Sequence, residues 1–328
     1  MRKGFPGFKL LLILSSIMPV LLSATLSVGA ADLTYLPLTF KNWDANPPLT
    51  VTNACSFPIW VQQDKNHKLT DTPLVKKIEA GQSFDYPVDP KGRISTRFWP
   101  KWGCDAQGEN CLWGQSVTGT GGPDDYAPCP VTGCHAPADS KLEVTWGCAY
   151  SDPANNPLCE HKKPQTFYNG SAVDGYSLPF KINRSGDPAL SCQDINCSSL
   201  TLTNCPSDDN LSQGRLDTHP AYNSVDLRIL LNGQPTACFS PCKKLNTPQS
   251  PYGGFNLNEQ SDEAIMYCCP DPPILSLECN AGPVPQTKYV TMVHQMCPNT
   301  YGFAYDDTLA GFNCHYTTKF TLTFCPGI

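Results

Sequence analysis

Alternating hydrophobic and polar positions mark three stretches of the chain as β-strands. In residues 141–146 (KLEVTW) the three apolar side chains face one way, and the charged and hydroxyl side chains face the other. Residues 318–324 (TKFTLTF) alternate in the same way, and residues 50–62 are rich in β-branched and aromatic side chains. A period of two with one apolar face is typical of a half-buried sheet. Because two of these strands lie near opposite ends of the chain, we expect the termini to close the sheet.

Helical periodicity is weak along the whole chain. Residues 261–269 (SDEAIMYCC) offer Ser261 or Asp262 as the N-cap of a short helix, and residues 289–297 could form another. Residues 192–297 otherwise contain turns and cysteines with little periodicity, which indicates a region held by crosslinks. The sequence therefore predicts an all-β fold with a few short helices.

The first residues have the pattern of a targeting segment. Residues 1–31 begin with three cations, continue with an apolar run over 10–22 and end in small residues, which is typical of a secretory signal cleaved near Ala30 or Ala31. An uncleaved anchor is the alternative, but the run is short and contains Pro19. Residues 32–49 are predicted to form a lead-in to the folded domain.

The charge of the chain excludes several classes of partner. The formal net charge is −6, and removal of the three cations of the signal leaves 20 Lys and Arg against 29 Asp and Glu, or −9. Phosphate backbones and anionic lipid surfaces repel such a protein, and no basic stripe offsets this. We expect no nucleic-acid partner and, after signal cleavage, no membrane partner.

The composition indicates a crosslinked extracellular protein. All 18 cysteines follow the signal, and an even number in an exported chain predicts a disulfide framework. Charged residues make up only 16%, beside 32 prolines and 24 glycines. Metal binding by the cysteines is the alternative, which an oxidising compartment disfavours. The histidines and serines form no HExxH or GxSxG motif, so we expect no metal and no cofactor.

The spacing of the later cysteines carries a family resemblance. It runs C-x4-C-x7-C from Cys192, C-x3-C from Cys238, and an adjacent pair at Cys268 and Cys269, among the segments NACSFPIWV, FWPKWGC, VDGYSLPF, CPNTYGFAYDD and FTLTFCP. Together these motifs resemble the thaumatin-like (pathogenesis-related, osmotin/thaumatin) family over residues 50–328. The resemblance implies a secreted, monomeric β-sandwich with a disulfide-rich excursion at about residues 191–296.

The resemblance also implies the pairing of sixteen cysteines. The two that remain lie at the ends of the turn-rich insertion CAYSDPANNPLC, which the family pattern lacks, and we expect them to form a ninth bridge. The expected pairs are Cys55–Cys325, Cys104–Cys111, Cys129–Cys134, Cys148–Cys159, Cys192–Cys314, Cys197–Cys297, Cys205–Cys238, Cys242–Cys268 and Cys269–Cys279.

Members of this family have a cleft, lined by an arginine and four acids, that is associated with β-1,3-glucan. Matched one at a time to the family motifs, the arginine position holds a lysine here and one acid position holds an asparagine. The expected cleft residues are Lys101, Glu143, Asn169, Asp174 and Asp306. Lysine lacks the bidentate fork of a guanidinium, and asparagine cannot titrate.

Three functions remain open at this point. The first is defence-type binding of β-1,3-glucan or a cell-wall surface, in which Phe167, Tyr168 or Tyr305 could pack on sugar rings. The second is weak endo-β-1,3-glucanase activity with Glu143 and Asp174 as the two carboxyls that glycoside hydrolysis needs. The third is inhibition of a foreign hydrolase, in which the cleft has no part.

Two further motifs have no function assigned by these hypotheses. Residues 206–214 (PSDDNLSQG) could form a calcium loop or a solvated turn. Four asparagines begin N-x-S sequons, which matter if the host glycosylates, and they are Asn169, Asn183, Asn196 and Asn210.

Overall fold

The computed structural model describes residues 46–64, 67–114, 140–186, 192–214, 220–247, 249, 252–307 and 310–327. The expected signal at residues 1–31 and the expected bridge Cys129–Cys134 lie outside this part of the chain. Within it, no helix combines the length and the apolar character that spanning a bilayer requires.

A five-stranded sheet joins the two ends of the described chain. Its order is β10 (Ile195–Cys197), β9 (Phe180–Ser185), β15 (Lys319–Phe324), β1 (Asn46–Asn53) and β4 (Ser83–Val88). β1 and β15 pair in parallel, with Val51 opposite Leu322. The predicted closure of the sheet by the terminal strands is therefore confirmed.

A second, larger sheet carries the strand predicted at residues 141–146. Its order is β13 (Thr300–Tyr301), β7 (Gln165–Ser171), β6 (Lys141–Trp146), β5 (Arg93–Trp102), β2 (Ile59–Gln63) and β3 (Val75–Ile78), and β14 (Phe312–His315) also pairs with β7. β6 lies between β5 and β7, at the middle of the part of the sheet that forms the site described below.

Aromatic rings from the two sheets meet in one hydrophobic core. Tyr86 of β4 contacts Phe98 of β5 at 5.3 Å between ring centroids, and Phe320 of β15 contacts Trp146 of β6 at 5.7 Å and Tyr168 of β7 at 4.8 Å. All five side chains are buried. Edge-on and tilted ring pairs of this kind add to the stabilisation from burial alone. The predicted β-sandwich is confirmed.

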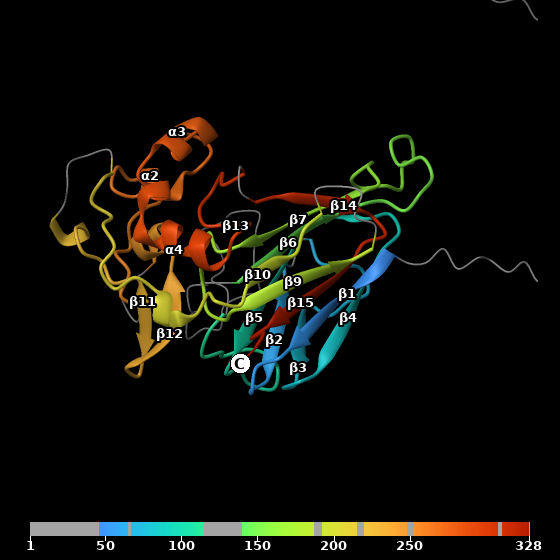
Figure 1. Ribbon diagram of the computed structural model, residues 1–328, viewed down its shortest axis with the longest axis horizontal. Helices are drawn as coiled ribbons and strands as arrows, with labels where there is room; N and C mark the ends of the chain where they lie inside the picture. Colours follow the sequence, from blue (N-terminus) through green and yellow to red (C-terminus); the bar gives the residue numbers. More distant parts are fainter. Residues whose placement is uncertain are drawn as a thin grey trace, which may run out of the picture. The chain divides into compact units, whose positions relative to one another are not determined.

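The remaining elements gather beside the two sheets, on the left of Figure 1. A three-stranded sheet has the order β11 (Arg228–Leu231), β12 (Gln234–Phe239) and β8 (Gly175–Tyr176). The helices are η1 (Leu202–Asn204), η2 (Pro220–Tyr222), α1 (Pro241–Asn246), α2 (Ile265–Cys268), α3 (Ser276–Ala281), η3 (Val284–Gln286) and α4 (Lys288–Met296). This region contains more regular structure than the sequence predicts, because its short elements lack a periodic apolar face.

The predicted strand at residues 50–62 forms two strands instead of one. β1 ends at Asn53, whose buried side-chain amide donates to the carbonyls of Phe57 and Ile78 and whose oxygen accepts from the N–H of Cys55. These bonds hold a turn between β1 and β2. The turn also places Cys55 at its bridge to the end of the chain.

The two predicted helices both exist, with different extents. Of residues 261–269 only Ile265–Cys268 is α-helical, and Ser261 accepts from the N–H of Ala264 in the turn before it. The second helix, α4, matches residues 289–297 closely and begins after Thr287, whose hydroxyl accepts from the N–H of Val290.

Eight of the nine expected disulfides form, and no described cysteine is free. Five of them join segments at least 26 residues apart in sequence, and three close local loops with separations of 7, 10 and 11 residues. The pairs are Cys55–Cys325, Cys104–Cys111, Cys148–Cys159, Cys192–Cys314, Cys197–Cys297, Cys205–Cys238, Cys242–Cys268 and Cys269–Cys279.

Candidate functional site

A row of three polar side chains crosses the outer face of the larger sheet. The strand register places Arg97 of β5 opposite Glu143 of β6, and Glu143 opposite Asn169 of β7. Because side chains alternate along a strand, Leu142 and Val144 point into the core while Glu143 points away from it. The alternation that builds the core therefore also presents this row on the opposite face.

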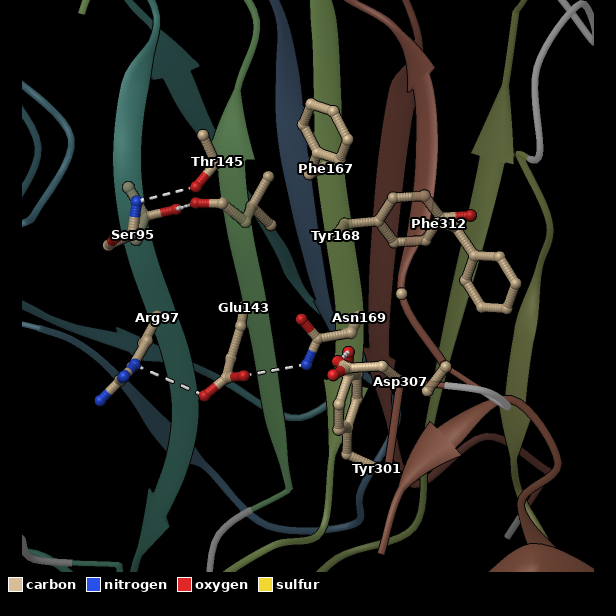
Figure 2. Close-up of a pocket in the computed structure, with 14 residues that line it drawn as sticks. Ser95, Arg97, Glu143, Thr145, Phe167, Tyr168, Asn169, Tyr301, Asp307 and Phe312 are labelled. Carbon is tan, nitrogen blue, oxygen red and sulfur yellow. Dashed lines mark hydrogen bonds and ion pairs between the residues drawn. The ribbon is translucent and has the colours of Figure 1, made fainter. Parts of the chain in front are cut away.

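The two neighbours of Glu143 hold its carboxylate in place. Arg97 Nε lies 3.4 Å from Oε1, and Asn169 Nδ2 donates to Oε2 at 2.9 Å. Figure 2 shows the three side chains in line across their strands. The side chains of Arg97 and Glu143 are 29% and 31% exposed, so solvent and a ligand can still reach them. The row offers fixed donors and acceptors to a polar ligand.

This row lines a groove of about 410 Å³. Phe167, Tyr301 and Phe312 contribute rings to its lining, and Asp307 adds a second carboxylate. The Tyr301 hydroxyl donates to Asp307 Oδ1 at 2.5 Å. Burial, and then the bond to this carboxylate, raise the pKa of Tyr301 well above its usual value, so the hydroxyl remains a donor. A sugar has apolar ring faces, which can pack on aromatic rings, and hydroxyl groups, which can bond to the polar side chains. The groove offers both kinds of partner.

One end of the groove is closed by packing on the same face of the sheet. Trp99, two residues beyond Arg97 on β5, is fully buried, and its Nε1 donates to the carbonyl of Gly114 at 3.2 Å. Next to it, Trp113 packs against Tyr252 at 6.2 Å between ring centroids. The face is therefore covered at Trp99 and open from Arg97 onward.

The segment that follows the insertion, residues 160–163, supports the other end. The His161 ring stands edge-on to Phe167 at 5.2 Å, and Lys163 Nζ lies 5.6 Å from the centroid of that ring. Burial, and then the charge of Lys163, lower the pKa of His161, so its ring is a neutral packing partner at neutral pH. The segment after Cys159 thus packs against the groove's Phe167.

Of the five residues expected in the cleft, Glu143 and Asn169 line this groove. Lys101 does not, because it lies two residues beyond Trp99 toward the covered end of β5. Its side chain is buried, and Nζ donates to Gln62 Oε1 at 3.2 Å. The cation at the groove is Arg97 instead.

Asp174 lines a second, smaller pocket of about 150 Å³ beside α1. Its carboxylate forms an ion pair with Lys141, and Lys243 Nζ lies 3.4 Å from Oδ1. Lys141 shares the outer face of β6 with Glu143, and the two are about 7 Å apart along the strand, given ~3.3 Å per residue. Asp174 therefore lies near the groove but outside it, and its carboxylate is paired with two ammonium groups.

Asp306 also lies outside the groove. It is 2% exposed, and its Oδ2 accepts from His294 Nε2 at 2.7 Å and from the N–H of Gly302 at 2.8 Å. The preceding residue, Tyr305, has a φ of 66°, and the turn exposes Asp307 while it buries Asp306. The acidic side chain of this segment that lines the groove is thus the second aspartate.

Sequence reasoning missed Arg97, Tyr301 and Phe312 as lining residues. Arg97 and Glu143 are brought together by the pairing of β5 with β6, and Phe312 lies opposite Tyr168 of β7. Because Arg97 and Trp99 are two residues apart on β5, the sequence indicates that their side chains share a face. It does not indicate which positions on that face remain exposed to solvent. Of the aromatic candidates, Phe167 presents its ring to the groove, whereas the ring of Tyr168 is buried against Phe320 and Tyr305 does not line the groove.

The comparisons with family models and known sequences point to one family. The model of the thaumatin family matches residues 53–326. Thaumatin-like protein 1 of Arabidopsis thaliana is 26% identical over 85% of this chain and 86% of its own length, and a Prunus avium protein named Glucan endo-1,3-beta-glucosidase is 26% identical over 89% and 96%. The solved structure of the thaumatin-like xylanase inhibitor TLXI covers 85% of this chain and 99% of that one, at 13% identity and a TM-score of 0.33.

Proposed function

Because the chain belongs to the thaumatin family, we propose that it is an exported protein that binds β-1,3-glucan, or a closely related neutral polysaccharide, in the groove beside Glu143. The observation that carries this proposal is the half-exposed row of Arg97, Glu143 and Asn169, bordered by the ring of Phe167. The pattern of residues 1–31 supports export.

The groups in the groove suit neutral sugar hydroxyls. Glu143 and Asp307 accept hydrogen bonds, and Arg97, Asn169 and the Tyr301 hydroxyl donate them. Arg97 largely offsets the charge of Glu143, so the row has little net attraction for a strongly charged ligand. Apolar rings with a few placed polar groups are the usual composition of a small-molecule site.

The contacts of the two proposed catalytic carboxyls, Glu143 and Asp174, favour binding over hydrolysis. A glycosidase needs one protonated carboxyl and a second carboxyl across the scissile bond. Both oxygens of Glu143 are engaged by donors, and Asp174 lies in the second pocket between two lysines. We therefore expect no release of reducing sugar from laminarin, and substantial release would replace the binding proposal with the glucanase alternative.

Glu143→Gln is expected to weaken retention on insoluble β-1,3-glucan about tenfold. The change removes the charge that Arg97 pairs with and one acceptor for sugar hydroxyls, and a hydrogen bond to a charged group contributes about 1.5–3 kcal/mol. The measurement is a depletion isotherm on washed glucan particles. The matched control is Glu79→Gln, since Glu79 is an exposed glutamate paired with Lys77 outside the groove. Equal retention by both variants would remove Glu143 from the site.

Phe167→Ala is expected to reduce retention several-fold with little change in the polar row. The ring is the apolar surface at the groove end that His161 supports. Phe84→Ala is the control, because Phe84 also lies under a lysine, with Lys76 Nζ 4.5 Å from its centroid, and does not line the groove. Retention that falls equally in both variants would indicate a general loss of stability.

A further inference from the structure

The four N-x-S sequons differ in what the asparagine amide does in the fold. An N-linked glycan bonds to Nδ2 and replaces one of its two N–H groups. A sequon is therefore compatible with the native fold only where at least one N–H is dispensable and the glycan can extend into solvent. The bonds of each amide and the secondary structure around it together separate the four sites.

Two of the asparagines use their amide inside the fold. Asn169 Nδ2 donates to Glu143 Oε2 at 2.9 Å and lies 3.4 Å from the carbonyl oxygen of Gly170, within the groove. Asn183 Nδ2 donates to Asp194 Oδ2 at 3.1 Å. A glycan at Asn169 would disturb the polar row and fill the groove.

Asn196 is exposed, but its sequon is locked in a strand. The middle residue, Cys197, is fully buried and bonded to Cys297, and Asn196 pairs with Lys181 across β10 and β9. Formation of the bridge fixes the sequon against the neighbouring strand and removes the access that a transferase needs. Formation of the disulfide at Cys197 thus competes with glycosylation of Asn196.

Asn210 alone combines an exposed side chain with an uncommitted amide in a loop. Its Oδ1 accepts from the Ser212 hydroxyl at 2.7 Å and from the Ser212 N–H at 3.0 Å. In the part of the chain that the structure describes, no group accepts from Asn210 Nδ2. The side chain is therefore held by its oxygen, and its nitrogen remains available.

The backbone beneath Asn210 is fixed, so the loop does not need the asparagine amide for its shape. The N–H of Asn210 donates to Asp209 Oδ1 at 2.9 Å, and the buried Asp209 carboxylate also accepts from the N–H groups of Lys288 and Tyr289 at the start of α4. This segment, which the sequence left open as a calcium loop or a turn, caps a helix. No described residues form a cluster suited to a metal ion.

We infer that Asn210 is an N-glycosylation site of this protein. The inference rests on the proposed export of the chain, and it is independent of what the groove binds. In the transfer step, Asn210 Nδ2 bonds to the anomeric carbon of a lipid-pyrophosphate-linked oligosaccharide, and the anomeric carbon–oxygen bond breaks. The lipid pyrophosphate leaves with the electron pair, and Nδ2 loses one proton to a base of the host transferase.

The test is site occupancy in the full chain made in a eukaryotic secretory host. Secreted and cell-associated protein are digested, and the peptide of residue 210 is examined by mass spectrometry before and after enzymatic deglycosylation. We expect most copies of this peptide to carry a glycan. An unmodified Asn210 in secreted protein would overturn the inference, whereas absence of the protein from the medium would count against export instead.

Two serine variants provide a matched check by the mass of the intact protein. Ser212→Ala destroys the sequon of Asn210 and is expected to remove the mass of one glycan. Ser185→Ala, which destroys the sequon of Asn183, is expected to leave the mass pattern unchanged, because this sequon lies within β9, where Asn183 pairs with Thr321 and its amide donates to Asp194. The opposite result for the pair would overturn the assignment, and analysis of the cell-associated fraction keeps this readout available if a variant folds poorly.

Discussion

Replacing Cys55 and Cys325 together by serine is expected to lower the free energy of unfolding by about 4 kcal/mol. The bridge spans 270 residues of sequence and joins the turn after β1 to the end of β15, the two strands that pair in parallel at the centre of the five-stranded sheet. Its loss gives the unfolded chain a large gain in entropy, although the other bridges share part of that constraint. The measurement is denaturant unfolding under non-reducing conditions.

The matched control is the double variant Cys104→Ser/Cys111→Ser. This bridge closes a sequence separation of only 7, and the entropy of loop closure grows with the logarithm of loop length. We expect its removal to cost about 2 kcal/mol. An equal or larger loss in the control would show that local packing, and not the length of the closed loop, determines the stabilisation by these bridges.

The same strands show how far the sequence predicts the fold. Residues 141–146 and 319–324 form strands in the structure because each has an uninterrupted period of two and one apolar face. Residues 50–62 show the same composition but contain a turn, and that turn depends on Asn53 bonding to Ile78, a contact that no local pattern announces. The cysteine pairs followed from the family resemblance, since spacing alone leaves their connectivity open, except Cys148–Cys159, which was expected because only these two cysteines remained.

The candidate site was only partly predictable, for a different physical reason. A period-two pattern says which side chains share a face, but it does not say which rows of that face are later covered. Lys101 and Arg97 have the same parity on β5, and the packing of Trp113 and Tyr252 beside Trp99 buries one row and leaves the other open. These contacts join residues far apart in sequence.

The sequence also does not indicate which of two adjacent aspartates in a turn, Asp306 or Asp307, is exposed at the groove. The sequence placed Asp306 in the cleft with Asp307 beside it, and the structure buries the first against His294 and exposes the second. Which of the two faces the groove depends on the left-handed conformation of Tyr305. A non-glycine residue rarely adopts that conformation, so the sequence gives little warning of it.

The second large effect is expected at Asp174, where the ion pair with Lys141 connects β6 to the segment before β8. The Lys141 side chain is 4% exposed, so Asp174→Ala removes a carboxylate from a buried ammonium group. Breaking a fully buried pair costs about 3–5 kcal/mol, and the 21% exposure of Asp174 reduces this to about 2 kcal/mol. The expected result is a corresponding decrease in the free energy of unfolding. Lys243→Met, whose side chain is 25% exposed, should cost less than half as much.

The double variant Asp174→Ala/Lys141→Met distinguishes a stranded charge from lost packing. Methionine fills much of the volume of the lysine stem without a charge, so we expect the double variant to be more stable than Asp174→Ala alone by about 1 kcal/mol. A double variant no more stable than the single one would contradict the ion-pair explanation.

The same double variant tests whether Asp174 contacts glucan, as the family motif implies. If the double variant regains stability but is no longer retained on glucan, this pocket belongs to the binding site. If it is fully retained, the role of Asp174 is limited to holding the sheet and α1 together.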